Sequence, residues 1–288
     1  MDAPPDKEDT GPFVRIAQQF RKIGLNVPEV IEQDLDNGFL LLSDLGQQTY
    51  LGLLDAGNVE RLYGDAMDAL MVLQIGTDTD PDFLPKYDRR LLLDEMALFR
   101  DWLLRQHLGL DLNDEQLRSL QDSFDFLASS ALEQPSVWVH RDYHSRNLMK
   151  TERHNPGILD FQDAVSGPVT YDLVSLLKDC YIDWPREQVE SWVKAYHRLS
   201  LESGLRITKD EQEYLRWFDL MGVQRHLKAS GIFARLYHRD GKTGYLADIP
   251  RTVGYISQLR DHYPELMPLI EMIDSIDWKV ASQASKVS

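Results

Sequence analysis

Apolar residues recur at helical spacing near the start of the chain and over much of its length after residue 58. Thr10 and Pro12 are typical of a helix start, and apolar residues follow them at intervals of three and four as far as Gly24. This spacing predicts a short amphipathic helix. The same kind of pattern predicts further helices over residues 58–73, 88–107, 113–130, 171–180, 186–204, 209–237 and 253–262.

Segments with the pattern of strands are fewer and shorter. Apolar runs at 27–31 and 38–42 flank an Asn-Gly pair, which is typical of a hairpin turn. Two later runs, 137–139 and 157–159, each lead directly into polar residues. We therefore expect an α+β fold that is mostly helical, with two short strands that deliver polar side chains at their ends.

The composition indicates a globular protein and limits the classes of molecule that could bind to it. The 288 residues include 43% apolar side chains, enough to fill a core. Asp and Glu number 47 against 31 Lys and Arg, a formal net charge of −16, which disfavours nucleic acid as a partner. A polyphosphate can still bind, because Mg²⁺ held by a few carboxylates reverses the local sign of charge.

The cysteine content and the first residues of the chain indicate the cellular compartment in which the protein works. Cys180 is the only cysteine, which excludes an intrachain disulfide and a cysteine-based zinc cluster. Residues 1–9 are acidic and proline-rich, unlike a secretory signal, and no uninterrupted apolar stretch reaches the roughly 18 to 20 residues that span a bilayer. We expect a soluble cytoplasmic protein.

The segment 140–147, HRDYHSRN, carries the strongest chemical signal. Asp142 stands five residues before Asn147, and Asp160 follows thirteen residues later, after an apolar run. Phosphoryl transfer needs a carboxylate to orient and deprotonate the attacking hydroxyl, and oxygen ligands for the Mg²⁺ that neutralises the phosphates. The spacing predicts Asp142 as the base and Asn147 with Asp160 as metal ligands.

The same segment offers an alternative from another enzyme class. His140, Asp142 and His144 form an H-x-D-x-H cluster whose side chains are suitable metal ligands for a hydrolase. Such a site would need further ligands, and the six histidines outside this segment form no similar cluster.

These motifs resemble a known superfamily. Residues 140–147 resemble the H-G/R-D-x-x-x-x-N loop of protein-kinase-like enzymes, and residues 159–161, LDF, resemble their metal-binding strand end. Residues 163–173 are similar to the D-x-x-x-G-x-x-x-x-D-L continuation of aminoglycoside phosphotransferases and choline kinases. The resemblance implies a two-lobed protein-kinase-like fold, ATP and Mg²⁺ as cofactors, and a small-molecule acceptor.

The resemblance also implies roles for residues around the loop. His140 and Asp172 would support the catalytic loop rather than perform chemistry. Ser43, Asp44 and Leu45 would form a hinge that contacts the nucleotide.

Further residues are candidates for contacts with the substrate. They include His144 in the loop and Asp163, which could instead cap a turn. Gln224, Arg225 and Lys228 lie within one predicted helix. The simpler interpretation of these three is a solvated helix face; the sharper one is that a cation here meets the lactyl carboxylate of a muramic acid.

Residues 140–149, 159–164, 222–228 and 38–46 resemble more closely the bacterial cell-wall amino-sugar kinases. This resemblance implies ATP-dependent phosphorylation of the anomeric hydroxyl of N-acetylmuramate and N-acetylglucosamine in cell-wall recycling. Kinases for choline, homoserine or aminoglycosides remain alternatives, as does a non-catalytic, kinase-like binding protein. The sequence leaves the oligomeric state open.

One expected feature of this fold is missing from the pattern. Kinases of this type place a glycine-rich loop over the phosphates and a cationic side chain on the third strand. Before Ser43 the glycines are isolated, and the only lysines are Lys7 and Lys22. We therefore expect an incomplete N-terminal lobe with the hinge at 1–46, and a helical C-terminal lobe with the catalytic loop and metal site at 47–288.

Overall fold

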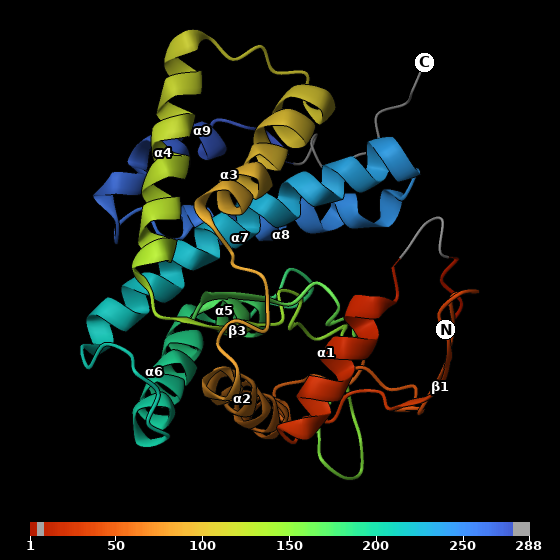
Figure 1. Cartoon of the computed structure of the whole chain (residues 1–288). Helices are drawn as coiled ribbons and strands as arrows, with labels where there is room; N and C mark the ends of the chain where they lie inside the picture. Colours follow the sequence, from red (N-terminus) through yellow and green to blue (C-terminus); the bar gives the residue numbers. More distant parts are fainter. Residues whose placement is uncertain (5–8, 279–288) are drawn as a thin grey trace. The chain divides into compact units, whose positions relative to one another are not determined.

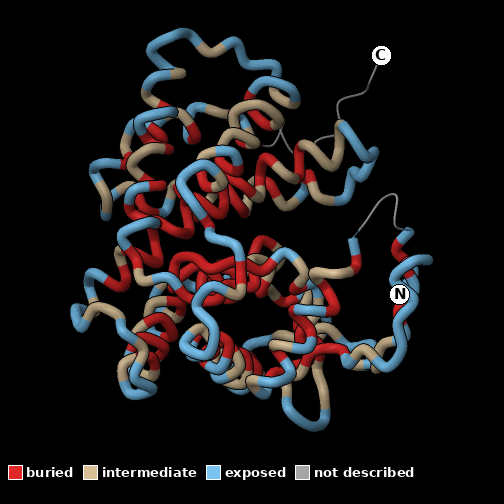
Figure 2. Tube along the Cα trace, in the orientation of Figure 1, coloured by how far each residue is buried: buried red, intermediate tan, exposed pale blue. Residues whose placement is uncertain are grey.

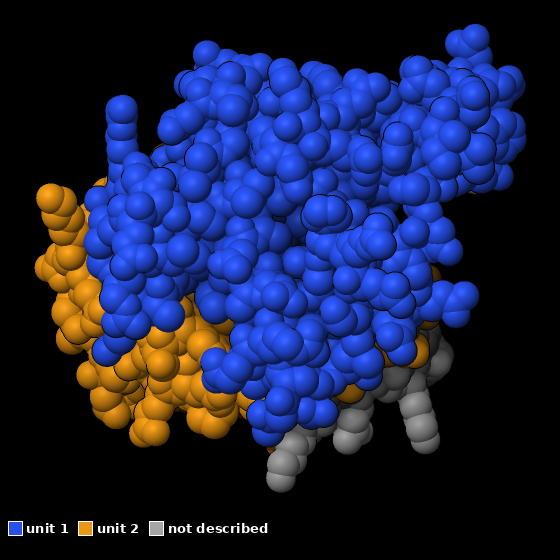
Figure 3. All heavy atoms as spheres, turned by 90° about the horizontal axis from the view of Figure 1, so that it is seen from below, with its two compact units in different colours: residues 1–86, 135–176, 194–207 blue, residues 87–134, 177–193, 208–288 orange. Residues whose placement is uncertain are grey.

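The chain divides into two compact units, each assembled from separated stretches of sequence and coloured separately in Figure 3. Unit 1 comprises residues 1–86, 135–176 and 194–207, and unit 2 comprises residues 87–134, 177–193 and 208–288. The computed structural model describes residues 1–4 and 9–278, so Lys7 lies outside the described residues. The expected lobes, 1–46 and 47–288, stay a prediction.

Helix α1 (Gly11–Lys22) of unit 1 confirms the first predicted helix (Figure 1). Pro12 lies in its first turn, where an N–H group would have no partner within the helix. Phe13, Ile16 and Phe20 are buried, as their helical spacing predicts. Unit 1 also contains α2 (Val59–Gly76) and the 3₁₀ turn η1 (Thr77–Thr79).

The described part of unit 1 contains three small antiparallel sheets. They pair β1 (Val30–Asp34) with β2 (Phe39–Leu42), β3 (Ser136–Val139) with β6 (Val165–Pro168), and β4 (Leu148–Met149) with β5 (Gly157–Ile158). The β1–β2 hairpin confirms the predicted Asn-Gly turn, and β3 and β5 confirm the two later strands. The sequence pattern does not predict β4, which has two residues, or β6, which contains Gly167 and Pro168.

Aromatic side chains form the centre of unit 1. The Phe161 ring centroid lies 4.8 Å from that of Phe13 and 5.8 Å from that of Phe20. Phe20 in turn stacks on Trp138 at 6.1 Å. The segment after β5 is therefore packed into the same core as α1 and β3.

The β1–β2 sheet differs from this core because several of its apolar side chains face solvent. Ile31, Phe39 and Leu41 are 55%, 52% and 57% exposed. The backbone of Met1 and Ala3 continues the pairing on the other side of β2, through bonds to Leu40 and Gly38. The hairpin thus carries an exposed apolar face.

Unit 2 is built around the long helix α7 (Glu211–Asp240). Figure 2 shows this helix buried along most of its length, and it contacts α3, α4, α8 and η2. Helices α5 (Tyr171–Leu177) and α6 (Arg186–Glu202) each have residues in both units. The remaining elements of unit 2 are α3 (Arg89–Leu98), the π-helix η2 (Phe99–His107), α4 (Asp114–Glu133), the 3₁₀ helices η3 (Thr243–Asp248) and η4 (Pro264–Leu266), α8 (Ile249–Ser257) and α9 (Met267–Asp274).

The structure places helices at all seven predictions from residue 58 onward, with ends that differ by up to five residues. The predicted helix 88–107 continues as the π-helix η2 after Leu98, the prediction 253–262 overlaps α8 only over 253–257, and α9 lies outside the predictions. Among the described residues, no helix is both long enough and apolar enough to cross a membrane.

Gly231 lets α7 approach the junction of α3 and η2, since a Cβ atom there would lie 2.3 Å from the backbone carbonyl carbon of Leu98.

Candidate functional site

The predicted catalytic loop, residues 140–147, connects β3 to β4 in unit 1. Asp172, fully buried in the first turn of α5, accepts hydrogen bonds from the backbone N–H groups of His140 (2.6 Å) and Arg141 (3.0 Å). Arg141 has a left-handed backbone with φ +76°, a conformation that needs support from its surroundings. The Asp172 carboxylate holds the beginning of the loop at this turn.

His140 is engaged through both ring nitrogens. Its Nε2 lies 2.9 Å from the carbonyl oxygen of Leu159, and its Nδ1 lies 3.2 Å from the backbone N–H of Asp142, which donates to it. Burial lowers the pKa of His140 to about 4, so the ring is neutral at pH 7. The lone pair of Nδ1 is engaged by the Asp142 N–H and Nε2 carries the proton, so neither nitrogen is available to a metal. In the described part of the chain, His140, Asp142 and His144 form no group that could hold a metal ion.

Asn147 connects the other two residues that the spacing singled out, Asp142 and Asp160. Its Nδ2 donates to the backbone oxygen of Asp142 (3.0 Å) and to Oδ2 of Asp160 (3.2 Å). The N–H of Leu159 donates to the backbone oxygen of Asn147 at 2.9 Å. The end of β5 and the loop 140–147 are therefore connected by backbone and side-chain hydrogen bonds.

Asp160 lies at the edge of a pocket of about 800 Å³, a size typical of small-ligand sites. Its backbone is left-handed, with φ +66°, and its Oδ1 accepts a hydrogen bond from Gln162 Nε2 at 2.9 Å. Asn147 and Asp163 also line the pocket, together with the apolar residues Phe13, Pro28, Leu42 and Leu159. Lys22 is not among the lining residues.

The donor set at the pocket fits Mg²⁺. Asp160 lies next to the Asn147 side-chain amide, whose Nδ2 donates to its carboxylate. Both side chains carry hard oxygen atoms of the kind that Mg²⁺ takes as ligands. Within residues 1–4 and 9–278, no group of three or more His, Cys, Asp and Glu side chains could hold a metal ion. Mg²⁺ accepts such a sparse set, because it keeps water ligands and takes oxygens from substrate phosphates.

The other predicted contacts of unit 1 lie around this pocket or in the loop. The backbone oxygen of Asp163 accepts from Arg141 Nη1 (3.3 Å), and His144 N donates to the backbone oxygen of Asp142 (3.0 Å). In the predicted hinge, Ser43 pairs with Glu29 through its N–H and its Oγ. The N–H and the Oγ of Ser43 are therefore engaged within the β1–β2 region.

Gln224, Arg225 and Lys228 lie on α7 in unit 2, and their interpretation as a solvated helix face is wrong. They are 0%, 5% and 8% exposed, because α7 has neighbours on several sides. Gln224 Nε2 lies 3.2 Å from Tyr87 Oη and 3.3 Å from Glu95 Oε2, and Lys228 Nζ lies 3.0 Å from Glu95 Oε1. The Glu95 carboxylate thus compensates the buried Lys228 charge.

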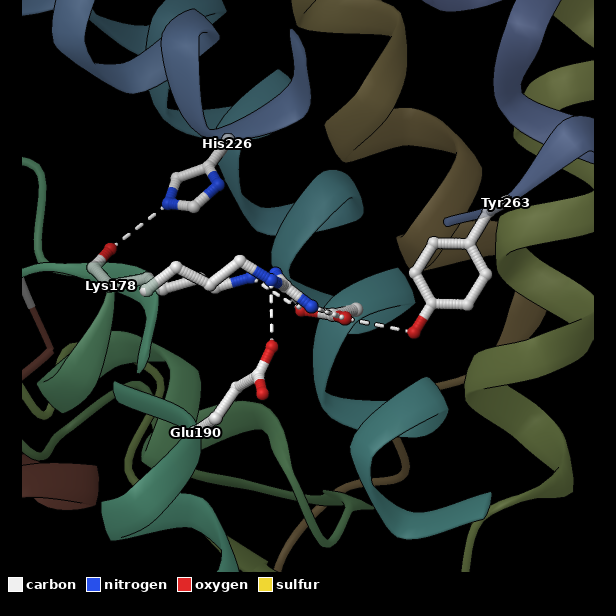
Figure 4. Close-up of polar contacts among 6 residues, drawn as sticks. Lys178, Glu190, His226 and Tyr263 are labelled. Carbon is white, nitrogen blue, oxygen red and sulfur yellow. Dashed lines mark hydrogen bonds and ion pairs between the residues drawn. The ribbon is translucent and has the colours of Figure 1, made fainter. Parts of the chain in front are cut away.

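A second buried polar cluster in unit 2 has no counterpart among the sequence predictions (Figure 4). Asp219, fully buried on α7, lies 2.7 Å from Lys178 Nζ, 2.8 Å from Arg186 Nη2 and 2.8 Å from Tyr263 Oη. Burial raises the pKa of Asp219, but Lys178 and Arg186 outweigh it and bring the pKa to about 2. Glu190 also pairs with Arg186, at 2.8 Å.

His226 extends this cluster through the backbone. Its Nε2 donates to the carbonyl oxygen of Lys178 at 2.9 Å, and its ring stacks on Tyr255 at 4.6 Å. Burial lowers the pKa of His226 to about 3. The cluster therefore anchors the segment between α5 and α6 to α7.

The site in unit 1 combines a braced loop that carries Asp142, a contact between Asn147 and Asp160, and a pocket of about 800 Å³ beside them. Phosphoryl transfer uses residues of these types next to a nucleotide-sized pocket. Together with the fold, this site defines a phosphotransferase of the protein-kinase-like class. The chain matches the family described as "Phosphotransferase enzyme family" over residues 1–212 and belongs to it.

Individual relatives agree with this assignment. The chain is 49% identical over 276 residues to the N-acetylmuramate/N-acetylglucosamine kinase of Pseudomonas aeruginosa, covering 96% of this chain and 81% of that protein. A choline/ethanolamine kinase family protein from Mesorhizobium loti superimposes with a TM-score of 0.61 at 14% identity, covering 93% of this chain and 84% of the other. The ADP-bound aminoglycoside phosphotransferase APH(2'')-Ib gives a TM-score of 0.53 at 18% identity, covering 86% and 84%.

Proposed function

We propose that this protein is a cytoplasmic kinase that transfers phosphate from ATP to the anomeric hydroxyl of N-acetylmuramate and N-acetylglucosamine in cell-wall sugar recycling. The observation that carries the proposal is the contact of Asn147 with both Asp142 and Asp160 beside a pocket of about 800 Å³. The amino-sugar acceptor is supported by the 49% identity to the kinase of Pseudomonas aeruginosa.

In this proposal Asp142 accepts the proton of the attacking hydroxyl. Asn147 and Asp160 would hold Mg²⁺, which neutralises phosphate charge when bound. His140 and Asp172 act indirectly, because their hydrogen bonds fix the loop that carries Asp142. Positioning and electrostatics then supply the rate enhancement, without a covalent intermediate.

The candidates for sugar contacts are His144 and Asp163 in unit 1 and Gln224, Arg225 and Lys228 in unit 2. Asp163 lines the pocket, and Gln224, Arg225 and Lys228 are buried, which supports roles beyond solvation. His144 is a candidate because it lies in the loop that carries Asp142. Each remains a proposal.

An ADP-release assay with a panel of acceptors tests the function. The panel contains N-acetylmuramate, N-acetylglucosamine, choline, homoserine and an aminoglycoside, and we expect turnover of the two amino sugars. Asp142→Asn should lower kcat by about 100-fold or more, since it removes the general base. Asp36→Asn, a change in an exposed hairpin turn, is the control and should leave kcat unchanged.

Two outcomes would contradict the proposal. Preferred turnover of choline or an aminoglycoside would assign another acceptor. Binding of ATP with no turnover of any acceptor would favour the non-catalytic alternative.

A further inference from the structure

The Asp160 carboxylate is held at both of its oxygens. Asn147 Nδ2 lies 3.2 Å from Oδ2, and Gln162 Nε2 lies 2.9 Å from Oδ1. Among the described residues, Gln162 supplies the hydrogen bond to Oδ1. The sequence patterns assign it no role, because it stands between residues with stronger motif signals.

The main chain on either side of Asp160 is fixed by its neighbours. The Leu159 backbone is bonded to Asn147 and to His140, and the Phe161 ring is fully buried against Phe13. The N–H of Ala164 closes a turn onto the backbone oxygen of Phe161 at 3.1 Å. With the backbone set, the orientation of the Asp160 carboxylate depends mainly on its side-chain partners.

The two partners are not equivalent. Asn147 is itself a proposed ligand, and Oδ2 of Asp160 is the oxygen nearest to it. A cation bound at Oδ2 competes with the Asn147 donor for that oxygen, whereas the hydrogen bond from Gln162 to Oδ1 can stay in place and keep the carboxylate oriented. Carboxylates that bind metals are usually held by such a second partner.

We infer that Gln162 is a positioning residue that orients the Asp160 carboxylate for Mg²⁺. The inference rests on the proposed function, since it assumes that Asp160 is a ligand. It predicts that Gln162 affects the response to Mg²⁺ and not nucleotide binding or folding in general.

The test compares Gln162→Leu, which removes the donor, with Gln162→Asn, which keeps an amide but shortens its reach. Gln18→Leu, at an exposed position of α1, is the matched control. Calorimetry measures ADP affinity across a Mg²⁺ titration and in EDTA. We expect both Gln162 variants to need about tenfold more Mg²⁺ for half of the full effect on ADP affinity, with unchanged affinity in EDTA and an unchanged melting temperature.

Turnover gives the second readout. The Mg²⁺ concentration for half-maximal rate should rise by the same factor, while kcat at saturating Mg²⁺ stays close to that of the native protein. A Mg²⁺ response in the Gln162 variants equal to that of Gln18→Leu would overturn the inference.

The outcomes also separate this inference from the proposed function. If the native protein binds ADP in a Mg²⁺-dependent manner but phosphorylates no amino sugar, the acceptor proposal fails and the calorimetric comparison still decides the role of Gln162. If the native protein shows no Mg²⁺-dependent binding of ADP, both fail together.

Discussion

Asp172 and Asp219 are both fully buried carboxylates, one in each unit, and they satisfy their charge in different ways. Asp172 accepts hydrogen bonds from two backbone N–H groups at the start of the loop 140–147. Asp219 is surrounded by the side chains of Lys178, Arg186 and Tyr263. The Asp172 carboxylate is therefore bonded to consecutive backbone groups, whereas the Asp219 carboxylate is bonded to side chains from separate segments, two of them cationic.

The difference predicts what each residue controls. Backbone donors at fixed positions make Asp172 a determinant of loop shape, and therefore of where Asp142 lies. Cationic partners make Asp219 a part of a charge balance, in which each buried ion depends on the others for compensation. We expect changes at Asp172 to affect turnover most, and changes at Asp219 to affect stability most.

Asp219→Ala should have the largest effect on stability. It leaves the buried Lys178 ammonium without its carboxylate, while Arg186 keeps Glu190. We expect the free energy of unfolding to fall by about 3–5 kcal/mol. Urea unfolding followed by circular dichroism measures the change. Asp125→Ala, which breaks the half-exposed pair with Arg89, is the control and should cost about 1 kcal/mol or less. An equal loss of unfolding free energy in Asp219→Ala and Asp125→Ala would contradict a special contribution of Asp219 to stability.

Asp172→Asn tests whether Asp172 controls turnover more than stability. The amide keeps an acceptor oxygen but loses the charge and one of the two bonds, so the start of the loop can shift. We expect kcat to fall by about 100-fold, as small displacements of catalytic groups do, with a stability loss of about 1–2 kcal/mol. Steady-state kinetics of the folded fraction should show near-native kcat for Asp219→Asn. A similar loss of kcat in both variants would contradict the assignment.

The same contrast explains which parts of the site follow from the sequence. Asp142, Asn147, Asp160 and Asp172 belong to short motifs with fixed spacing, and the structure brings all four into one network. Asp219 has partners 41 and 33 residues earlier in the chain, and no local pattern connects them. Pairings made only by tertiary packing leave no periodic signal.

The fold shows a similar limit. Helical spacing predicts α1 and the long helices well, because their apolar faces are read directly from the sequence. It does not reveal that α7 is buried on several sides, so Gln224 and Lys228 look like surface residues until Glu95 is placed beside them. Strands β4 and β6 are short and depend on partners elsewhere in the chain.

The smallest expected effect concerns pH, and it separates His226 from Asp219 within one region. His226 contacts the Lys178 carbonyl oxygen and the Tyr255 ring, and burial, with the charges of Lys178 and Arg225, keeps its pKa at about 3. In the unfolded chain the His226 imidazole takes up a proton near pH 6.5, whereas in the folded protein it stays neutral down to a much lower pH. The free energy of unfolding therefore falls as the pH drops from 6.5 toward 3. Asp219, with a pKa of about 2, loses its stabilising contribution only as the pH falls from about 3.8 toward 2.

Between pH 7 and pH 5 the contribution of His226 should reduce the free energy of unfolding by about 2 kcal/mol. His140 acts in the same range, since burial brings its pKa to about 4, so the test is a difference between variants. His226→Gln keeps a donor for the Lys178 carbonyl but does not titrate, and its urea unfolding should lose about 2 kcal/mol less than the native protein over this range. His154→Asn is the control, because His154 is exposed and Asn tolerates its left-handed backbone. An unchanged pH dependence in His226→Gln would mean that the His226 ring takes up its proton at the same pH in the folded and the unfolded protein. That result would contradict a His226 pKa lowered by burial.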